Sequence, residues 1–240
     1  MHLVGILVAM VMWAAAPVRA EVWLIACDEN FPPYNYAENG RVIGLDAEIV
    51  AAIVRQAGAE PRIEPHPWNR VQQMLERGEV DAAFQFVGRA DRFDRYFMIG
   101  PHRTGSTVFA ARRGQTVAYR ELEDLHGLRI GVIQGYTYGA AFDESAFLIK
   151  DAAAGNYRQL VRMLAAGRVD LVIGDRETLT YFARLENLRE QITVLPKPFA
   201  KVPRYIAVPR SKPAIADRME KALAALRRNG GLAAILARWE

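Results

Sequence analysis

Apolar residues along the chain fall into two alternating patterns, short continuous runs and stripes at helical spacing. The continuous runs predict buried strands at residues 22–26, 61–64, 80–87, 128–133 and 169–173, with strand-like segments at 192–196 and 204–208. The stripes predict amphipathic helices that begin near Asp46, Trp68, Tyr157, Pro213 and Leu232. Strands and helices that alternate in this way favour a mostly parallel sheet covered by helices, and therefore the α/β class.

One segment of the chain is repeated. Residues 74–81 read MLERGEVD, and residues 163–170 read MLAAGRVD. In each copy a predicted helix is followed by a glycine, which permits a left-handed cap, and then by a buried strand. The repeat therefore predicts two similar α/β lobes. The copied residues are interpreted as structural, because Asp81 and Asp170 stand at strand starts, whereas open α/β sheets bind ligands at the carboxyl ends.

The first 20 residues, MHLVGILVAMVMWAAAPVRA, differ from the rest of the chain. They are apolar from Leu3 to Ala16 and end in the small-x-small sequence Val18-Arg19-Ala20. This pattern predicts a secretory signal peptide that is cleaved after Ala20, and hence an exported, periplasmic protein. The apolar run is too short to cross a bilayer as a helix.

An alternative cleavage site lies at Cys27. The residues Leu24-Ile25-Ala26-Cys27 match a lipoprotein signal, but Arg19 and Glu21 would then lie inside its hydrophobic region. Lipidation at this cysteine would also delete the first predicted strand. We therefore expect Cys27 to be a free, buried thiol, and a single cysteine excludes an intramolecular disulfide.

The charged residues are mixed in sign and scattered along the chain. The sequence holds 31 basic and 27 acidic residues, a formal net charge of +4, and 51% hydrophobic residues. This composition predicts a globular protein with a mixed surface and without a stripe for nucleic acid. The sequence contains no metal-ligand spacing, glycine-rich phosphate loop or nucleophile elbow. No metal, cofactor or catalytic residue is therefore predicted.

Polar and aromatic side chains lie at the carboxyl ends of four predicted strands or follow them, where ligands bind in sheets of this class. In chain order these candidates are Asp28, Phe31, Tyr34, Gln85, Phe86, Arg89, Arg92, Tyr136, Thr137 and Asp175. If the two lobes face each other, the cleft has basic groups on one wall, an acidic group on the other and aromatic rings between them.

At this point the sequence resembles a known family, the exported solute-binding proteins of the amino-acid type that serve ABC importers. The resemblance covers nearly all of the chain after residue 20 and rests on the stretches FPPYNYAENGRVIGLDAEIVAAIV, RGEVDAAF, GVIQGYTYG, AGRVDLVIGD and ALRRNGGLAAILARW, in this order. It implies two α/β lobes joined by a two-segment hinge around a ligand cleft. Lobe 1 would comprise residues 21–108 plus 205–240, and lobe 2 residues 109–204. It also implies a monomer that delivers a small-molecule ligand to the membrane subunits of an ABC transporter.

The resemblance also implies roles for individual residues. Arg92 would bind the α-carboxylate of the ligand, because a guanidinium can donate two parallel bonds to a carboxylate. Thr137 would add its hydroxyl and backbone N–H, and Asp175 would receive the α-ammonium from the opposite lobe. The remaining candidates would form apolar walls or contact the ligand's side chain, namely Phe31, Tyr34, Asp28 and Gln85. Trp68 is assigned to packing.

Three assignments keep an alternative. Arg92 could form a structural salt bridge to Asp91 or Asp94, and Asp175 could serve as a helix N-cap. Arg89 stands where relatives often carry Thr. It is either an ordinary surface charge or a second cation that selects a ligand with additional negative charge.

Two other functions are compatible with the same scaffold. The first is an enzyme such as a dehydratase of the cyclohexadienyl type, for which Asp28 is the best candidate general acid. The second is a ligand-sensing partner of a signalling receptor, which is not favoured because the sequence ends at Glu240 without a following transmembrane segment or kinase.

Overall fold

The computed structural model describes residues 20–239, so the predicted signal peptide lies outside the described residues except for Ala20. The strands are β1 (Glu21–Asp28), β2 (Asn30–Phe31), β3 (Asn35–Glu38), β4 (Arg41–Ile43), β5 (Ala59–His66), β6 (Ala82–Val87), β7 (Tyr96–Arg112), β8 (Arg129–Ile133), β9 (Ile149–Ala154), β10 (Leu171–Asp175), β11 (Ile192–Val194) and β12 (Ala200–Pro209). The helices are α1 (Leu45–Gln56), α2 (Trp68–Glu76), α3 (Ala90–Arg95), η1 (Leu122–Leu125), α4 (Ala140–Asp143), α5 (Tyr157–Ala165), α6 (Arg176–Leu185), α7 (Pro213–Arg228) and α8 (Gly231–Ala237).

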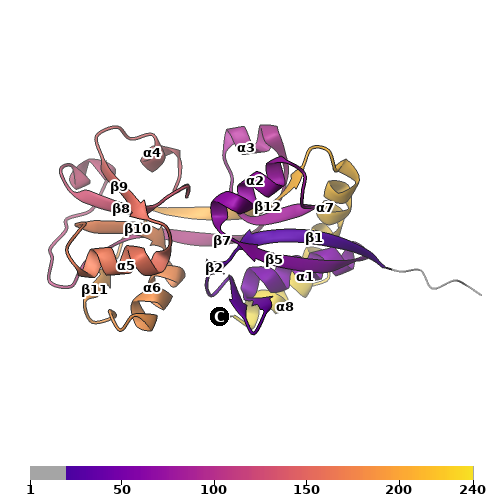
Figure 1. Ribbon diagram of the computed structural model, residues 1–240, viewed down its shortest axis with the longest axis horizontal. Helices are drawn as coiled ribbons and strands as arrows, with labels where there is room; N and C mark the ends of the chain where they lie inside the picture. Colours follow the sequence, from indigo (N-terminus) through magenta and orange to yellow (C-terminus); the bar gives the residue numbers. More distant parts are fainter. Residues whose placement is uncertain (1–19, 240) are drawn as a thin grey trace, which may run out of the picture.

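Two lobes share one sheet, whose strand order is β5-β1-β6-β12-β7-β10-β8-β9, with β11 paired to β7. The first lobe holds β1 to α3 with α7 and α8, and the second holds β8 to β11 with α4 to α6 (Figure 1). In this sheet β1 pairs parallel with β5 and β6, and β8 pairs parallel with β9 and β10, whereas β7 and β12 run antiparallel to each other and cross between the lobes. A separate antiparallel sheet of β2, β3 and β4 belongs to the first lobe. The predicted fold class is confirmed, and the boundaries at residues 108/109 and 204/205 stay a proposal.

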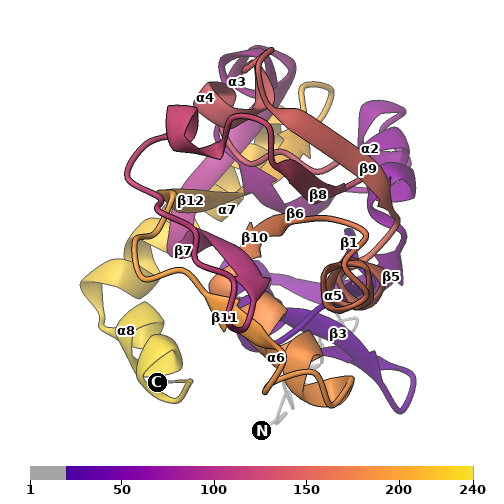
Figure 2. The same cartoon turned by 90° about the vertical axis from the view of Figure 1, so that its left-hand side faces the viewer.

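Helices cover both faces of the sheet in each lobe. In β1, Trp23 and Ile25 pack in the cluster that contains α1, whereas Ala26 packs in the cluster that contains α2. In the second lobe, α4 lies on one side of the strands and α5 and α6 lie on the other (Figure 2). Strands buried on both faces have continuous apolar sequences, which explains why these runs were recognisable.

The repeated glycines occupy equivalent places in the two lobes. Gly78 follows α2 with φ +68°, and Gly167 follows α5 with φ +70°. Each glycine N–H donates to a helical carbonyl, at 3.1 Å from Leu75 O in the first lobe and 3.0 Å from Leu164 O in the second. The repeat therefore encodes the same left-handed helix end twice, as predicted.

The repeated aspartates hold neighbouring strands together. The carboxylate of Asp81 accepts a bond from Leu24 N at 2.7 Å, and that of Asp170 accepts one from Arg129 N at 2.8 Å. In return, the N–H of each aspartate donates to the carbonyl of the same partner at 2.8 Å. This reciprocal pairing confirms the structural interpretation of both residues.

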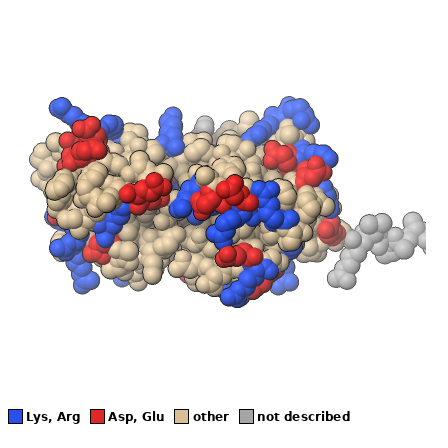
Figure 3. Space-filling view, turned by 90° about the horizontal axis from the view of Figure 1, so that it is seen from above, with Lys and Arg blue, Asp and Glu red and all other residues tan. Residues whose placement is uncertain are grey.

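Several further sequence expectations can be compared with residues 20–239. Cys27 is buried and free, as expected. Basic and acidic side chains alternate on the face shown in Figure 3, in agreement with a mixed surface. None of the described helices has the length and apolarity needed to cross a membrane, and no cluster of potential metal ligands occurs in this part of the chain.

Candidate ligand-binding site

A cavity lies where the carboxyl ends of β1 and β6 meet the loop after β8 of the second lobe. It is lined by Asp28, Phe31, Trp68, Gln85, Val87, Arg92, Tyr136, Thr137 and Arg204. Most of these residues belong to the first lobe. Tyr136 and Thr137 come from the second lobe, and Arg204 comes from the connecting strand β12. The cavity therefore lies at the strand ends at which the sequence placed the ligand.

Arg92 on α3 is a buried cation at the wall of the cavity. Its Nη1 donates to Val87 O at 3.1 Å, and its Nη2 lies 3.4 Å from Thr137 Oγ1 in the other lobe. The guanidinium lies 5.0 Å from the centre of the Phe86 ring. Burial lowers the pKa of Arg92 to about 10, so the side chain stays charged at neutral pH. Arg92 is thus a buried cation that already contacts both lobes.

The alternatives for the arginines of α3 are also clear from the contacts. Arg92 makes no ion pair with any carboxylate of residues 20–239, including Asp91 and Asp94. Asp91 instead accepts a bond from Arg89 Nε at 2.9 Å, and the Arg89 side chain is 43% exposed. The structure therefore places Arg89 outside the cavity.

Asp28 and Tyr136 contact each other across the cavity. The Tyr136 hydroxyl donates to Asp28 Oδ2, and Asn30 N donates to Asp28 Oδ1 at 3.0 Å. Burial raises the pKa of Asp28, and the two hydrogen bonds act in the opposite direction. Both carboxylate oxygens of Asp28 thus already accept a hydrogen bond from the protein.

Aromatic rings enclose the cavity in two layers. Phe31 and Trp68 line it directly. Behind them lie Tyr34, whose ring centre is 5.5 Å from that of Phe31, and Phe86, whose ring centre is 5.0 Å from that of Trp68. The sequence analysis assigned Trp68 to packing alone, whereas the structure shows it both packed on Phe86 and exposed to the cavity.

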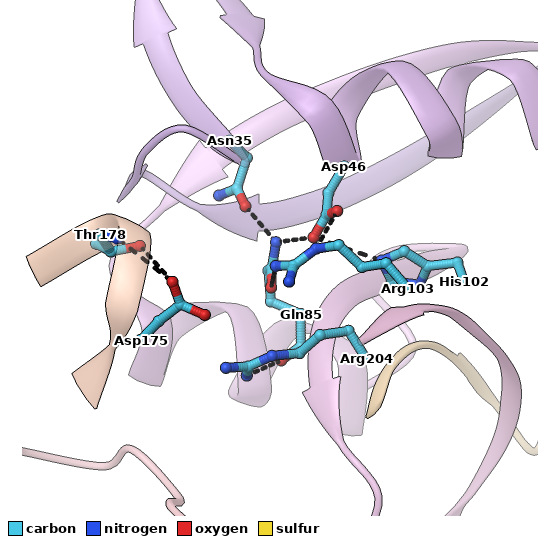
Figure 4. Close-up of polar contacts among 8 residues, drawn as sticks. All are labelled: Asn35, Asp46, Gln85, His102, Arg103, Asp175, Thr178 and Arg204. Carbon is cyan, nitrogen blue, oxygen red and sulfur yellow. Dashed lines mark hydrogen bonds and ion pairs between the residues drawn. The ribbon is translucent and has the colours of Figure 1, made fainter. Parts of the chain in front are cut away.

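Gln85 is held by a buried polar network (Figure 4). Its backbone has φ +76°, a conformation that non-glycine residues rarely adopt. The side-chain Nε2 donates to Asn35 Oδ1 at 2.8 Å and to Asp46, while Oε1 accepts from Arg103 Nη2 at 3.1 Å. The main-chain oxygen faces Arg204, whose Nη1 lies 3.4 Å away. The network therefore fixes the part of the cavity wall that supports Arg204.

Asp46 is the anion of this network. Its Oδ1 accepts a bond from Arg103 Nε at 2.5 Å, and both side chains are almost fully buried. Burial is the largest single influence and acts to raise the pKa of Asp46, but the charges and hydrogen bonds of Arg103 and His102 together outweigh it and lower the pKa to about 2. Asp46 and Arg103 thus form a structural ion pair behind the cavity.

Asp175 is the N-cap of α6, the alternative that the sequence analysis left open. Its Oδ1 accepts from Glu177 N at 3.1 Å and Thr178 N at 3.3 Å. Its Oδ2 is buried and has no hydrogen-bond partner among residues 20–239. Figure 4 shows this carboxylate facing Arg103 and Arg204. Asp175 does not line the cavity that contains Arg92.

The structure therefore divides the ten candidates into two groups. Those that line the cavity are Asp28, Phe31, Gln85, Arg92, Tyr136 and Thr137, and those that lie outside it are Tyr34, Phe86, Arg89 and Asp175. Arg204 was missed. The only signal in the sequence was one basic residue at the start of the strand-like segment 204–208.

Comparison with known proteins places this geometry in context. Residues 24–240 match the family described as bacterial extracellular solute-binding proteins, family 3. The chain is 25% identical over 230 residues to the arginine-binding periplasmic protein of Mannheimia haemolytica, covering 90% of each protein. It is 24% identical over 222 residues to ABC transporter arginine-binding protein 1 of Escherichia coli (strain K12), covering 88% of this chain and 87% of that protein.

Solved structures have the same fold. A histidine kinase sensor domain with similarity to periplasmic binding proteins gives a TM-score of 0.81 at 24% identity, covering 92% of this chain and 96% of that domain. An ancestral arginine-binding protein bound to arginine gives a TM-score of 0.79 at 22% identity, covering 91% and 97% of the two chains.

Proposed function

The chain belongs to the bacterial extracellular solute-binding proteins, family 3, and we propose that its ligand is a small carboxylate, an amino acid or a related anion. One observation carries this proposal. Arg92, a buried cation without a carboxylate partner in the described residues, lines a cavity between the lobes and contacts Thr137 of the second lobe. A carboxylate beside these two residues would accept charge-assisted bonds from both lobes at once.

Binding by groups of two lobes provides a mechanism for closure. The two connecting strands, β7 and β12, are the segments about which the lobes would move. A ligand that contacts Arg92 in one lobe and Thr137 in the other stabilises the closed arrangement by its difference in affinity for the closed and open states. The ligand is captured without covalent chemistry.

The cellular setting follows from the sequence and from the relatives. We propose cleavage after Ala20, a periplasmic location and delivery of the ligand, by a monomer, to the membrane subunits of an ABC importer. The names of the relatives support this setting, because they include a periplasmic protein and a component of an ABC transporter. Their names also specify arginine. For this chain we propose only the broader class.

A thermal-shift screen tests this function. Purified protein is heated with single amino acids, mono- and dicarboxylic acids and small amines at a fixed concentration. A ligand at a hundredfold excess over its Kd stabilises the folded state by about 2.7 kcal/mol, which raises the Tm by several degrees. Shifts confined to compounds with a carboxylate support the proposal. Shifts caused by amines that lack a carboxylate contradict it.

An enzyme on the same scaffold is the second candidate. Such an enzyme needs a general acid with a raised pKa, and Asp28 meets this requirement. This buried carboxyl group lies in the cavity together with Arg92, and burial raises its pKa. Incubation of the purified protein with prephenate or arogenate tests this candidate. Turnover that is lost in Asp28→Asn supports the enzyme, and intact substrate after prolonged incubation supports binding alone.

A further inference from the structure

Arg204 is the second cation of the cavity and is directed into it by an irregularity in β12. The pairing of β12 with β7 changes register between Arg204 and Ile206, and its pairing with β6 changes between Tyr205 and Ile206. Such a bulge re-orients the side chains of a strand. Arg204 thereby lines the same cavity as Arg92, although it comes from a strand that connects the lobes.

Arg204 is a buried charge without an ion-pair partner among residues 20–239. The residue is only 9% exposed, and its side chain makes one hydrogen bond within residues 20–239, from Nη1 to Gln85 O at 3.4 Å. Its Nε has no hydrogen-bond partner, and the side chain makes no ion pair with any residue from 20 to 239. Removal of a guanidinium from water is costly unless an opposite charge compensates it.

Arg103, which lies opposite Arg204 on the neighbouring strand, increases the free-energy cost of burying the Arg204 charge. Arg204 and Arg103 are directly opposite in the antiparallel pair of β12 and β7. Like charges at opposite positions repel each other. Arg103 is neutralised by Asp46 at 2.5 Å, whereas Arg204 has no such partner. Burial lowers the pKa of Arg204 and the charge of Arg103 lowers it further, whereas the charges of Asp175 and Asp46 act in the opposite direction without reversing the shift.

Asp175 compensates Arg204 only in part, because its charge acts on the guanidinium without forming an ion pair. Three polar atoms surround the point where a Cβ atom on Gly105 would lie. They are the unpartnered Asp175 Oδ2 at 2.9 Å, Arg103 Nη1 at 3.0 Å and Arg204 Nε at 3.7 Å. No ion pair forms between these groups within the described part of the chain. A ligand ammonium beside Asp175 would therefore also lie beside two guanidinium groups, which disfavours a cation at that position.

We propose that the cavity binds a small dicarboxylate, with one carboxylate on Arg92 and Thr137 and the other on Arg204. This inference rests on the proposed function, because it specifies the ligand class of the same cavity. Phe31 and Trp68 would enclose the carbon chain between the carboxylates. The idea that an additional cation selects an additional negative charge is retained from the sequence, but the cation is Arg204 and not Arg89.

Calorimetry with matched ligands tests the second carboxylate. Malonate, succinate, glutarate, aspartate and glutamate are titrated into the protein and compared with butyrate, alanine and arginine. A buried, hydrogen-bonded charge pair contributes about 2 kcal/mol or more, so at least one dicarboxylate should bind about 30-fold more tightly than every compound with one carboxylate. The two amino acids among the dicarboxylates show whether an α-ammonium is accepted as well.

Variants connect the effect to the guanidinium. Arg204→Gln should reduce dicarboxylate affinity by about 30-fold and leave the affinity for monocarboxylates within about threefold. Arg204→Lys keeps the positive charge at this buried position and should retain part of the preference for dicarboxylates. Binding by this variant shows that the cavity still folds when residue 204 is replaced. Arg95→Gln is the matched control, because it removes an arginine that pairs with Glu76 outside the cavity, and it should leave all affinities unchanged.

The outcomes separate this inference from the proposed function. If arginine or alanine binds more tightly than every dicarboxylate, or Arg204→Gln leaves the preference unchanged, the second carboxylate site is wrong while the proposed function stands. If no compound with a carboxylate binds, both proposals are wrong.

Discussion

Arg92 Nη2 lies 3.4 Å from Thr137 Oγ1, and the two residues belong to different lobes. The distance is long for a hydrogen bond, and both groups line the same cavity. A carboxylate oxygen placed between them would accept from the guanidinium and from the hydroxyl. The pair therefore forms a bridge that a ligand can strengthen, which connects binding to the relative position of the lobes.

Replacement of Thr137 by valine removes the hydroxyl and keeps the size and branching of the side chain. A lost hydrogen bond to a charged group costs about 1.5 kcal/mol or more, so ligand affinity should fall at least tenfold. Calorimetry measures the affinity, and the Tm without ligand should change little because the existing contact is weak. An unchanged affinity would show that the ligand does not contact the second lobe here.

The repeated glycines predict matched losses of stability. Gly78→Ala and Gly167→Ala each force a side chain into a left-handed conformation, with φ +68° and +70°, at a cost of about 1 kcal/mol. Space is not limiting, because the new Cβ atoms would lie 3.7 and 3.8 Å from their nearest neighbours. Urea denaturation measures both losses.

Gly155→Ala is the control for these two variants, because this glycine has no left-handed backbone. Its unfolding free energy should stay within about 0.5 kcal/mol of the parent. Equal effects at all three positions would mean that the repeat does not encode helix ends.

Asp46 should make the free energy of unfolding depend on pH in the acidic range. Its pKa in the folded state, about 2, lies below its ordinary value of 3.8, so the folded state favours the ionised form. The resulting stabilisation, about 2 kcal/mol, is complete well above pH 3.8 and is lost as the pH falls towards 2. Unfolding free energies of the parent and Asp46→Asn, measured from pH 6 to pH 2, should converge at low pH. Parallel curves would contradict this prediction.

The strands that the sequence predicted correctly are those whose burial is similar along most of their length. β1 and β10 are buried on both faces, so their apolar runs were continuous. β7 was missed because it passes from one lobe to the other and changes environment on the way. Its sequence includes Gly100, Pro101, Arg103 and Gly105, a mixture typical of a loop.

The cavity was only partly predictable for the same reason. Residues at the end of a buried strand or shortly after it, such as Asp28 and Arg92, were found because strand ends are where sheets of this class bind ligands. Arg204 belongs to a connecting strand, and a change of register that no local pattern reveals turns it towards the cavity. For Arg89 the sequence left a surface charge and a second cation of the site as alternatives, and the structure pairs it with Asp91 at the surface, at the start of α3.

The central claim is that Arg92 binds the ligand's carboxylate, and calorimetry of Arg92→Ala tests it most directly. Arg95→Ala is the matched control, because Arg95 lies on the same helix, is half exposed and pairs with Glu76. With the compound that gives the largest thermal shift, Arg92→Ala should lose about 100-fold or more in affinity, and Arg95→Ala should bind like the parent. Parent-like binding by Arg92→Ala would contradict the account.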